Sequence, residues 1–305
     1  MNPVPEKWRV TFAPAPQPGS VACARVAVPP DLEVWQDNNG NVCAYGYIAD
    51  SYGWMDLVGT GKFRFDPRKR EVTAFALPDV GPDLVRDAYS HAALPMALHF
   101  FGCEVLHASA VRTIRGVIAF CAFSETGKST IASAFALRGY SLWADDAVAI
   151  DSRDTVHGGT ALETLRLPFS PRLRHASAQY LGERDYCANR GELDREFATN
   201  PLAAVCVLKR CSELGRDLEI RRLSPGEAFG ALLPHAFCFS IGDQERKRAM
   251  LRLYLRVAAE TPVFAIAFAP GFERLPGILD AIENTIPAFA PRSSRMAPSV
   301  LSERP

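Results

Sequence analysis

The chain has 305 residues, enough to bury a substantial core in one large domain or in two modest ones. Its 34 basic and 34 acidic side chains give a formal net charge of zero, so no overall field would attract nucleic acid or an anionic membrane. No apolar run is long enough to span a bilayer, and the N-terminus lacks the apolar core of a signal peptide. We therefore expect a globular protein of the cytoplasm.

The eight cysteines show no pattern of a metal site or a redox pair, because no CxxC motif and no histidine-rich segment accompanies them. Cys103, Cys121 and Cys206 lie in apolar stretches such as VIAFCAF and AAVCVLK, where cysteine behaves as a small hydrophobic residue. We expect these side chains to be buried and the cysteines to be reduced.

Residues 1–95 predict a β-rich N-terminal region. Short alternating runs (RVTFAP, CARVAV, CAYGYIA and KFRFD) are separated by turn signals such as DNNGN and DPRK, which is typical of antiparallel hairpins. The GTGK stretch at 59–62 contains Gly-Lys, but Phe63 follows the lysine and the surroundings are a hairpin, so it predicts an ordinary turn.

From Pro82 the apolar period becomes helical. Residues 82–102 predict one helix with a break near Pro95 that ends at Gly102. The stretch EVLHASAVRTIRGVIAFCAF then predicts two β runs joined by the polar RTIR turn. The KSTIASAFALRG segment predicts a helix that stops at Gly139. After it, YSLWADDAVAI predicts a buried strand ending in two carboxylates.

The distal half continues with alternating elements. Residues 155–200 are polar and rich in arginine, and they predict a long functional loop with short helices. PLAAVCVLKR, LEIRRL and TPVFAIAFA predict strands. SPGEAF predicts a helix start, because Ser224 is an N-cap residue and Glu227 stands three positions later. Residues 243–259 and the LPGILDAIENTI segment predict two further amphipathic helices.

The stretch AFSETGKST matches the pattern of a phosphate-binding loop, which is Gly or Ala, four residues, and then Gly-Lys-Ser/Thr. Successive backbone N–H groups of such a loop wrap a phosphate, and the N-terminus of the following helix favours negative charge. A buried strand precedes the motif and a helix follows it, as the pattern requires. The alternative is a structural turn, and an acidic residue, Glu125, occupies a position where a small one is usual. The candidate nucleotide-binding residues are Ser124, Glu125, Thr126, Gly127, Lys128, Ser129 and Thr130.

Asp145 and Asp146 follow the loop lysine at the end of the next apolar run. Carboxylates at this place can hold Mg²⁺ and accept a proton from an attacking hydroxyl, although a turn or a helix cap also accounts for an Asp-Asp pair. His107 lies in VLHASAV, just before the hairpin that leads to the loop; a single histidine in a strand is usually structural.

The order LHASAV, AFSETGKST, RGYSLWADDAVAI resembles the catalytic domain of HPr kinase/phosphorylase and the wider group of phosphoenolpyruvate-carboxykinase-like kinases. The resemblance covers residues 100–150 and extends more loosely through 201–290. It implies an α/β fold, in which a P-loop core with a mixed central sheet occupies residues 96–288. The β-rich region 1–95, which does not resemble the N-terminal domain of HPr kinase, precedes this core, and a disordered tail, 289–305, follows it.

The resemblance also implies an ATP-dependent kinase that uses Mg²⁺, with site residues carried over by motif. The loop residues 127–130 would bind the triphosphate and its metal, and Ser129 and Asp146 would be metal ligands. Asp145 and Asp146 would divide the duties of general base and metal ligand, with Lys128 as a further catalytic group. His107 would tune the carboxylates. Either Arg166 or Arg210 would steady the transferring phosphoryl group.

The Gly-rich signature of true HPr kinases is missing, which favours one of their divergent relatives. Proteins similar to these phosphorylate a serine of a lasso-peptide precursor, so we expect a serine hydroxyl of a peptide or small protein as acceptor. The arginine-rich stretch 166–190 would suit an acidic substrate, or it forms a solvated loop face. The resemblance further suggests a homo-oligomer. The balanced charge, and basic residues that are not interleaved with aromatics, predict neither nucleic acid nor membrane as partner. Two alternatives stay open: a nucleotide-binding regulatory protein without transfer activity, which Ala122 and Glu125 favour, and a kinase of small molecules.

Overall fold

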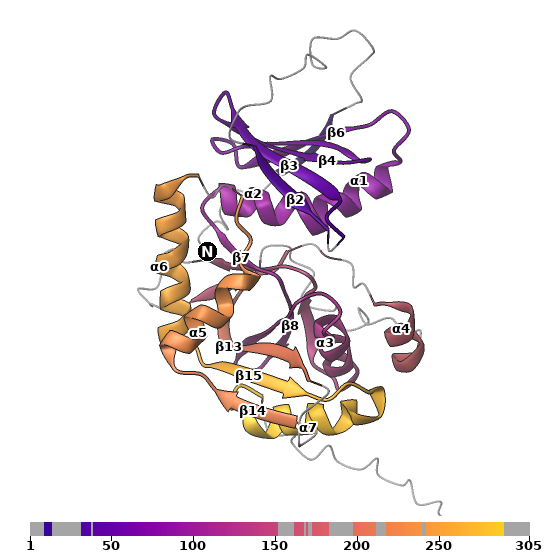
Figure 1. Ribbon diagram of the computed structural model, residues 1–305, viewed down its shortest axis with the longest axis vertical. Coiled ribbons are helices and arrows are strands. Elements are labelled where there is room, and N and C mark those ends of the chain that lie inside the picture. The colour runs from indigo at the N-terminus through magenta and orange to yellow at the C-terminus, as the bar shows by residue number, and fades with distance from the viewer. Residues whose placement is uncertain are drawn as a thin grey trace, which may run out of the picture.

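The computed structural model describes residues 9–13, 32–37, 39–151, 162–167, 169, 173–182, 198–211, 218–239 and 242–289, the first range as backbone only. Its secondary structure forms an N-terminal sheet, a helical segment beneath it, and a mixed central sheet with helices on both faces (Figure 1). The expected α/β class with a β-rich N-terminal region is confirmed at this level. None of the helices in the described ranges is long and apolar enough to cross a membrane.

The N-terminal sheet has the strand order β1-β6-β5-β4-β3-β2. The strands from β2 to β6 pair antiparallel through short turns, as predicted, and the GTGK stretch spans the end of the turn between β4 and β5 and the first two residues of β5. The prediction of hairpins throughout was wrong for β1, which pairs parallel with β6. No tight turn joins these two strands, so turn geometry does not impose antiparallel pairing. The strands are β1 (Arg9–Ala13), β2 (Glu33–Gln36), β3 (Val42–Ala49), β4 (Tyr52–Leu57), β5 (Gly61–Asp66) and β6 (Glu71–Ala76).

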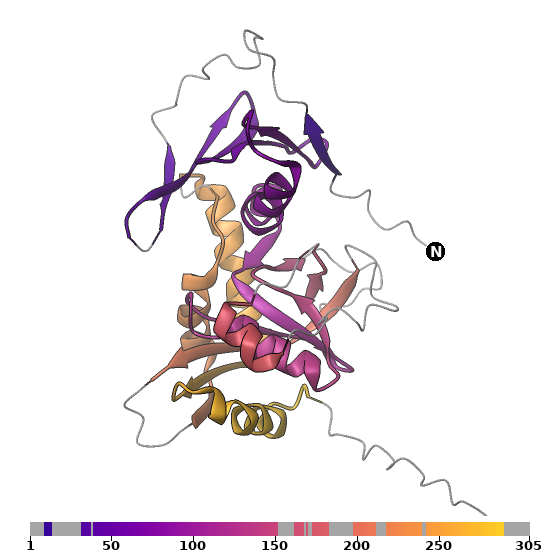
Figure 2. The same ribbon diagram turned by 90° about the vertical axis from the view of Figure 1, so that its right-hand side faces the viewer.

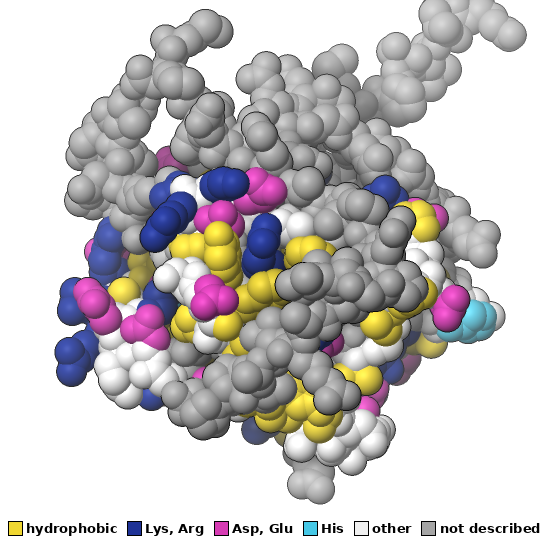
Figure 3. Space-filling model, turned by 90° about the horizontal axis from the view of Figure 1, so that it is seen from above, with side chains coloured by type: hydrophobic (Ala, Val, Ile, Leu, Met, Phe, Trp, Pro, Cys, Tyr) yellow, Lys and Arg dark blue, Asp and Glu magenta, His cyan; other side chains and the backbone are white. Residues whose placement is uncertain are grey.

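The two faces of this sheet differ. Hydrophobic side chains gather on the outer face (Figure 3), where the rings of Tyr47, Trp54 and Phe75 stack in a row with centroids 6.3 and 6.0 Å apart. On the inner face, Phe63 and Phe65 are fully buried against the helical segment below. Because side chains alternate between the two faces along each strand, every second residue packs against the helical segment, and these contacts hold the sheet to the rest of the molecule.

The helical segment is continuous, but its geometry differs from the prediction. It consists of α1 (Pro82–Ala88), a π-helical turn η2 (Tyr89–Ala93) and α2 (Leu94–Phe100), and the chain leaves the helix at Gly102 with a φ of 92°. The predicted break near Pro95 is instead a widened turn just before it. Proline has no N–H to give to the carbonyl four residues earlier, and a wider turn accommodates the missing bond.

The central sheet divides at the long strand β13 (Thr199–Arg210), which pairs with strands of both parts. One part has the order β10-β8-β9-β13-β15-β14, and the other, β7-β11-β12, joins the beginning of β13. β9 and β15 run parallel to β13, and the other pairs are antiparallel. The remaining strands are β7 (Glu104–Leu106), β8 (Ala108–Thr113), β9 (Gly116–Cys121), β10 (Ser141–Ala144), β11 (Val148–Asp151), β12 (Glu163–Leu165), β14 (Leu218–Arg222) and β15 (Val263–Phe268).

Helices cover the two faces of the larger part (Figures 1 and 2). In β9, Ile118 and Phe120 face α3 and α7, while Val117 and Ala119 face α5 and α6. Because both faces are covered, the whole strand is buried, which explains its continuous apolar run. The helices of the central region are α3 (Lys128–Leu137), α4 (His175–Leu181), α5 (Pro225–Leu232), α6 (Gln244–Glu260) and α7 (Leu275–Thr285), with short 3-10 turns η3 (Leu233–His235) and η4 (Phe272–Arg274).

Several local predictions are confirmed. The three cysteines named above are buried, α3 ends before Gly139, and the Glu227 carboxylate accepts the Ser224 N–H at the start of α5. Two others were wrong. YSLWADDAVAI forms two strands, β10 and β11, separated by a turn at the two carboxylates, and the region predicted to hold two β runs before the loop holds three strands.

The predicted 155–200 loop and the predicted tail, 289–305, lie partly outside the described residues. Of the 155–200 stretch, the structure describes β12, α4 and a few flanking residues. Phe289, the first residue of the predicted tail, is buried and stacks on Phe135 with a centroid distance of 4.6 Å, so the packed chain extends at least that far. Residues 290–305 lie outside the described ranges.

Candidate functional site

The 122–127 loop joins the end of β9 to the first residue of α3. Ala122 is fully buried, which accounts for a small residue there. Gly127 has a φ of 114° and Glu125 a φ of 70°, so the chain turns twice through left-handed backbone before the helix begins. Glycine adopts this conformation without strain, whereas a glutamate in it costs about 1–2 kcal/mol. The position of Glu125 is therefore one where glycine would be the unstrained choice.

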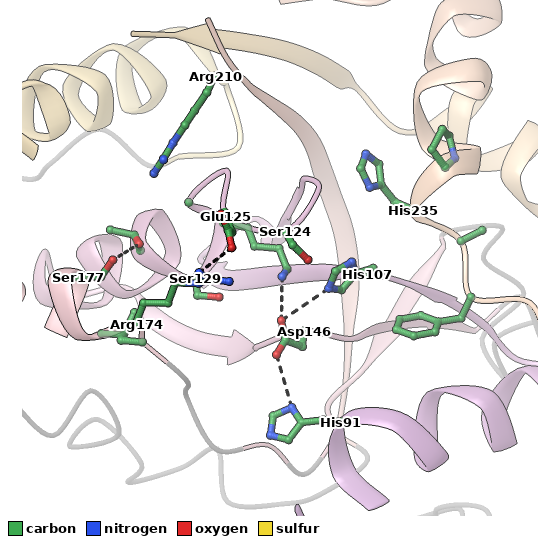
Figure 4. Close-up of a pocket in the computed structure, with 17 residues that line it drawn as sticks. His91, His107, Ser124, Glu125, Ser129, Asp146, Arg174, Ser177, Arg210 and His235 are labelled. Atoms are coloured by element: carbon green, nitrogen blue, oxygen red, sulfur yellow. Dashed lines mark hydrogen bonds and ion pairs between the residues drawn. The ribbon is translucent and has the colours of Figure 1, made fainter. Parts of the chain in front are cut away.

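Lys128, the first residue of α3, faces the turn between β10 and β11. Its Nζ lies 2.8 Å from Oδ1 of Asp146, and the lysine is buried at 8% exposure. Asp146 itself has a φ of 65°, a left-handed conformation that aims its carboxylate away from the strand and toward the loop (Figure 4). The two residues that the sequence separates by eighteen positions thus meet as an ion pair.

Two histidines complete the surroundings of the Asp146 carboxylate. His107, between β7 and β8, places Nε2 at 3.7 Å from Oδ1, and His91, from the π-helical turn η2, places Nδ1 at 3.5 Å from Oδ2. Burial alone would raise the pKa of Asp146, but its contacts with both histidines and the charge of Lys128 outweigh that effect. The pKa of this carboxyl therefore lies well below its ordinary range, and Asp146 is ionised at neutral pH.

Asp145 occupies a different environment. Its side chain is buried beneath the loop, where the Ser109 hydroxyl donates a hydrogen bond of 2.6 Å to Oδ1. The Ser109 Oγ also lies 3.3 Å from the Ser129 Oγ at the start of α3. The two carboxylates therefore have different surroundings. Asp146 faces the cavity, whereas Asp145 is buried and accepts a hydrogen bond from Ser109, whose hydroxyl contacts that of Ser129.

Further side chains surround the loop on its exposed side. Arg210, at the end of β13, donates from Nε to the carbonyl oxygen of Thr126 at 2.9 Å. Arg174 Nη1, just before α4, lies 2.8 Å from Glu125 Oε1. At the start of that helix, the hydroxyl groups of Ser177 and Thr130 are 2.9 Å apart.

A cavity of about 640 Å³ lies at the centre of these contacts (Figure 4). His235, on its far side, lies beside Phe123, with ring centroids 5.0 Å apart and ring planes tilted by 51°. Burial, together with the nearby charges of His107 and Lys128, lowers the pKa of His235 from 6.5 to about 4, so this side chain is neutral at pH 7. The walls combine cationic, hydroxyl and carboxylate groups, which suits a charged, polar ligand.

A second cavity of about 170 Å³ adjoins the first and shares Gly127, Thr130 and Arg210 with it. Its other walls are largely apolar and come from β15, η4 and α7, with Phe272 at its edge. The Phe272 ring stacks on Tyr180 of α4 at 4.8 Å between centroids and an interplanar angle of 16°. A polar cavity at the loop therefore continues into an apolar one.

The structure brings most of the predicted residues together. Ser124, Glu125, Gly127, Lys128, Ser129, Thr130, His107 and Asp146 line the larger cavity, whereas Thr126 lines the smaller one and Asp145 lies behind the wall. Of the two candidate arginines, Arg210 lines both cavities. Arg166 instead lies over the rings of Trp143 and Phe169, each at 5.8 Å, and is not among the lining residues.

Four polar lining residues were not singled out in the sequence: His91, Arg174, Ser177 and His235. The spacing of His91 before Pro95 was a usable signal, because a proline four residues later leaves a carbonyl without its partner and favours a distorted helical turn. Nothing in the sequence connected that turn with Asp146.

The oxygen donors beside the loop suit Mg²⁺. In the described ranges, no three His, Cys, Asp or Glu side chains form a cage that could hold a metal ion. Magnesium at phosphate sites does not require one, because it takes one or two protein oxygens and completes its shell with phosphate and water. Ser129 and Asp146, with Asp145 behind Ser109, offer hard oxygen ligands of this kind.

Neither family models nor curated proteins match this chain. Among solved structures, it is similar to the HPr(Ser) kinase/phosphatase from Coxiella burnetii, with 13% sequence identity and a TM-score of 0.33. The similarity covers 59% of this chain and 88% of that one. With so low a TM-score the likeness carries no weight in assigning a function.

Proposed function

We propose that this protein is an ATP-dependent kinase that transfers the γ-phosphoryl group to a hydroxyl, as a divergent relative of the HPr kinase/phosphorylases. The observation that carries the proposal is the meeting of Lys128 and Asp146 at 2.8 Å in a polar cavity beside the 122–127 loop. Phosphoryl transfer needs a cation for the phosphates and a base for the acceptor hydroxyl in one place, and these residues supply both.

Lys128 would bind the β- and γ-phosphates, and the backbone N–H groups at the start of α3 would cradle them. Ser129 would hold Mg²⁺, with Asp145 behind it through Ser109, and the ion supplies charge neutralisation at the phosphates when bound. Arg210 lies at the border of the two cavities, where its guanidinium would contact the phosphate chain. The apolar cavity beside Phe272 is then the place for the nucleoside, since it adjoins the phosphates on the side away from Asp146.

Asp146 would accept the proton of the attacking hydroxyl. A triphosphate in the loop competes with this carboxylate for the Lys128 ammonium group. Weakening that pair raises the pKa of Asp146 toward the range in which it accepts a proton. His107 would orient the same carboxylate, while Asp145 would hold Ser109 and, through it, Ser129.

For the acceptor we propose a serine of a peptide or small protein, such as a lasso-peptide precursor. The exposed guanidinium of Arg174 at the cavity rim supports an acceptor that carries a carboxylate, because arginine binds carboxylates through two parallel hydrogen bonds. A small-molecule kinase is the alternative, and the 640 Å³ volume suits it, because ligand pockets span about 300–1,000 Å³.

The test is transfer of the γ-phosphoryl group of labelled ATP to serine-containing peptides, to free serine and to sugars. Lys128→Ala and Asp146→Asn are each expected to lower transfer about 10²- to 10⁴-fold, to a small residual rate, and Lys128→Ala alone should also weaken nucleotide binding. Ile114→Ala, on the exposed tip of the β8–β9 hairpin, serves as a control that leaves both unchanged. Full transfer by the two site variants would contradict the mechanism.

One observation favours a second candidate, a nucleotide-binding regulatory protein without transfer activity. Glu125 brings a negative charge to the loop and has a left-handed backbone conformation there. A glycine at this position would avoid both the charge and the backbone strain, to the benefit of a transfer enzyme. This candidate predicts saturable ATP binding that depends on Lys128, with no product on any hydroxyl acceptor.

A further inference from the structure

His91 connects the β-rich N-terminal region to the candidate site. It belongs to the helical segment that packs under the N-terminal sheet, yet its Nδ1 lies 3.5 Å from Oδ2 of Asp146. We propose that His91 is a positioning residue for the Asp146 carboxylate, so that the N-terminal region completes the active site. This inference rests on the proposed function.

The π-helical turn is what brings the ring to the carboxylate. Within it the Leu94 N–H bonds to the Tyr89 carbonyl, one residue further than in an α-helix. The extra residue widens the turn immediately before Pro95, which has no N–H for the carbonyl of His91. Such turns commonly occur at functional positions, because they shift one side chain relative to the regular helix. Here the shifted side chain is His91, and Figure 4 shows it pointing at Asp146 from below.

Packing fixes the direction of the ring. The His91 side chain is only 12% exposed, and its Nδ1 faces Asp146. Nε2 lies 3.4 Å from Oδ1 of Asp87, one turn earlier in α1, and makes no hydrogen bond among the described residues. A ring whose orientation is fixed by packing restricts in turn the carboxylate that it contacts.

His91 contacts a different oxygen of Asp146 from the one that Lys128 and His107 contact. Oδ1 faces Lys128 and His107, while Oδ2 faces His91. Phosphates compete for Lys128, so a bound nucleotide weakens the contact that holds Oδ1. The His91 contact lies on the other oxygen and is unaffected by that competition. It therefore keeps the carboxylate, whose backbone has a strained φ of 65°, aimed at the acceptor during transfer.

The first test reads the contact without relying on activity. In ¹⁵N-histidine-labelled protein, the long-range ¹⁵N–¹H spectrum identifies which ring nitrogen of each histidine carries a proton, and His91→Asn assigns the signal. We expect the ring proton to lie on Nδ1, the nitrogen that faces Asp146, and its shift to move in Asp146→Asn. A His91 protonated only at Nε2 would overturn the proposal.

The second test measures turnover. His91→Leu removes the donor and is expected to lower kcat about 10- to 100-fold, the usual effect of losing an orienting partner, while the KM for ATP stays within about twofold. His91→Asn, whose amide N–H stands near the place of Nδ1, should recover part of the loss. Ser90→Ala, in the same turn but with its hydroxyl bonded to the Arg86 carbonyl, is the matched control and should leave kcat unchanged.

A double-mutant cycle separates positioning from a general structural effect. If His91 acts through Asp146, His91→Leu causes no further loss of residual turnover in the Asp146→Asn background. An equal loss in both backgrounds, or a raised KM for ATP together with a lowered Tm, would overturn the proposal. If the wild-type chain transfers no phosphoryl group to any acceptor, the proposed function fails, and the ¹⁵N experiment decides the His91–Asp146 contact alone.

Discussion

Arg174 Nη1 lies 2.8 Å from Oε1 of Glu125, so the residue that departs from the usual loop pattern has a cationic partner across the cavity. Both side chains are more than half exposed, and solvent screens such a pair. The effect of the pair is therefore local: the arginine offsets the negative charge that Glu125 brings to the proposed phosphate site. This relationship accounts for the tolerance of a carboxylate at that position.

Glu125 is expected to weaken nucleotide binding through its charge. Glu125→Gln should tighten ATP binding about two- to fivefold at low ionic strength, because it removes a negative charge near the phosphates, and the gain should shrink as salt is added. Glu125→Gly removes the same charge and also relieves the left-handed backbone. Titration with a fluorescent ATP analogue measures both, and comparison of the variants separates charge from strain. Weaker binding by Glu125→Gln would contradict this account.

The apolar cavity beside η4 is expected to hold the nucleoside. Phe272→Ala should raise the KM for ATP several-fold through loss of apolar and stacking contacts, and it should leave the affinity for tripolyphosphate unchanged. Phe272→Tyr keeps the ring and serves as the matched control. Competition between the fluorescent analogue and tripolyphosphate gives the measurement. An equal loss of both affinities would place the nucleoside elsewhere.

A buried ion pair joins α6 to the central sheet. Arg246 bonds to the Glu104 carboxylate of β7, which is 3% exposed, and its Nε donates to the His99 carbonyl at the end of α2 at 2.7 Å. Arg246→Met should lower the free energy of unfolding by about 3–5 kcal/mol, because it leaves a buried carboxylate without its cation. Urea unfolding measures the change.

The double variant Arg246→Met, Glu104→Leu is the control for that prediction. It removes both charges, so most of the lost stability should return. If the double variant is no more stable than Arg246→Met alone, the unpaired carboxylate is not the cause of the loss.

Two buried histidines predict a loss of stability in mild acid. Burial, and then the charge of Arg246, lowers the pKa of His99 from 6.5 to about 3, and the pKa of His235 is about 4. As the pH falls below 6.5, the unfolded chain binds protons on these side chains while the folded protein does not. Each then removes up to about 1.4 kcal/mol of unfolding free energy per pH unit. The raised pKa of Glu104 has the opposite sign and offsets part of the loss.

Urea unfolding at pH 7, 6 and 5 measures this dependence. His99→Gln removes one of the two contributions, so its free energy of unfolding should fall less steeply over that range than that of the wild-type protein. An identical slope in the two proteins would show that His99 does not remain neutral in the folded state.

Much of the candidate site could be predicted from sequence, because the 122–130 loop and the carboxylates lie close together along the chain. A strand, a short loop with Gly127 at its end, and a helix in direct succession leave little freedom in where Lys128 and Ser129 point. The separate roles of Asp145 and Asp146 could not be predicted, since they depend on a left-handed turn that directs one side chain into the cavity and buries the other against Ser109.

By itself, the sequence determined the loop, the alternation of strands and helices, and the burial of the apolar strand β9, because these depend on local spacing and on the period of hydrophobic residues. Only the tertiary structure decided that His91, fifty-five positions before Asp146, stands beside that carboxylate. The reason is physical: packing of the N-terminal sheet against the helical segment sets where η2 lies, and such packing depends on contacts between residues far apart in the chain, which no local pattern records.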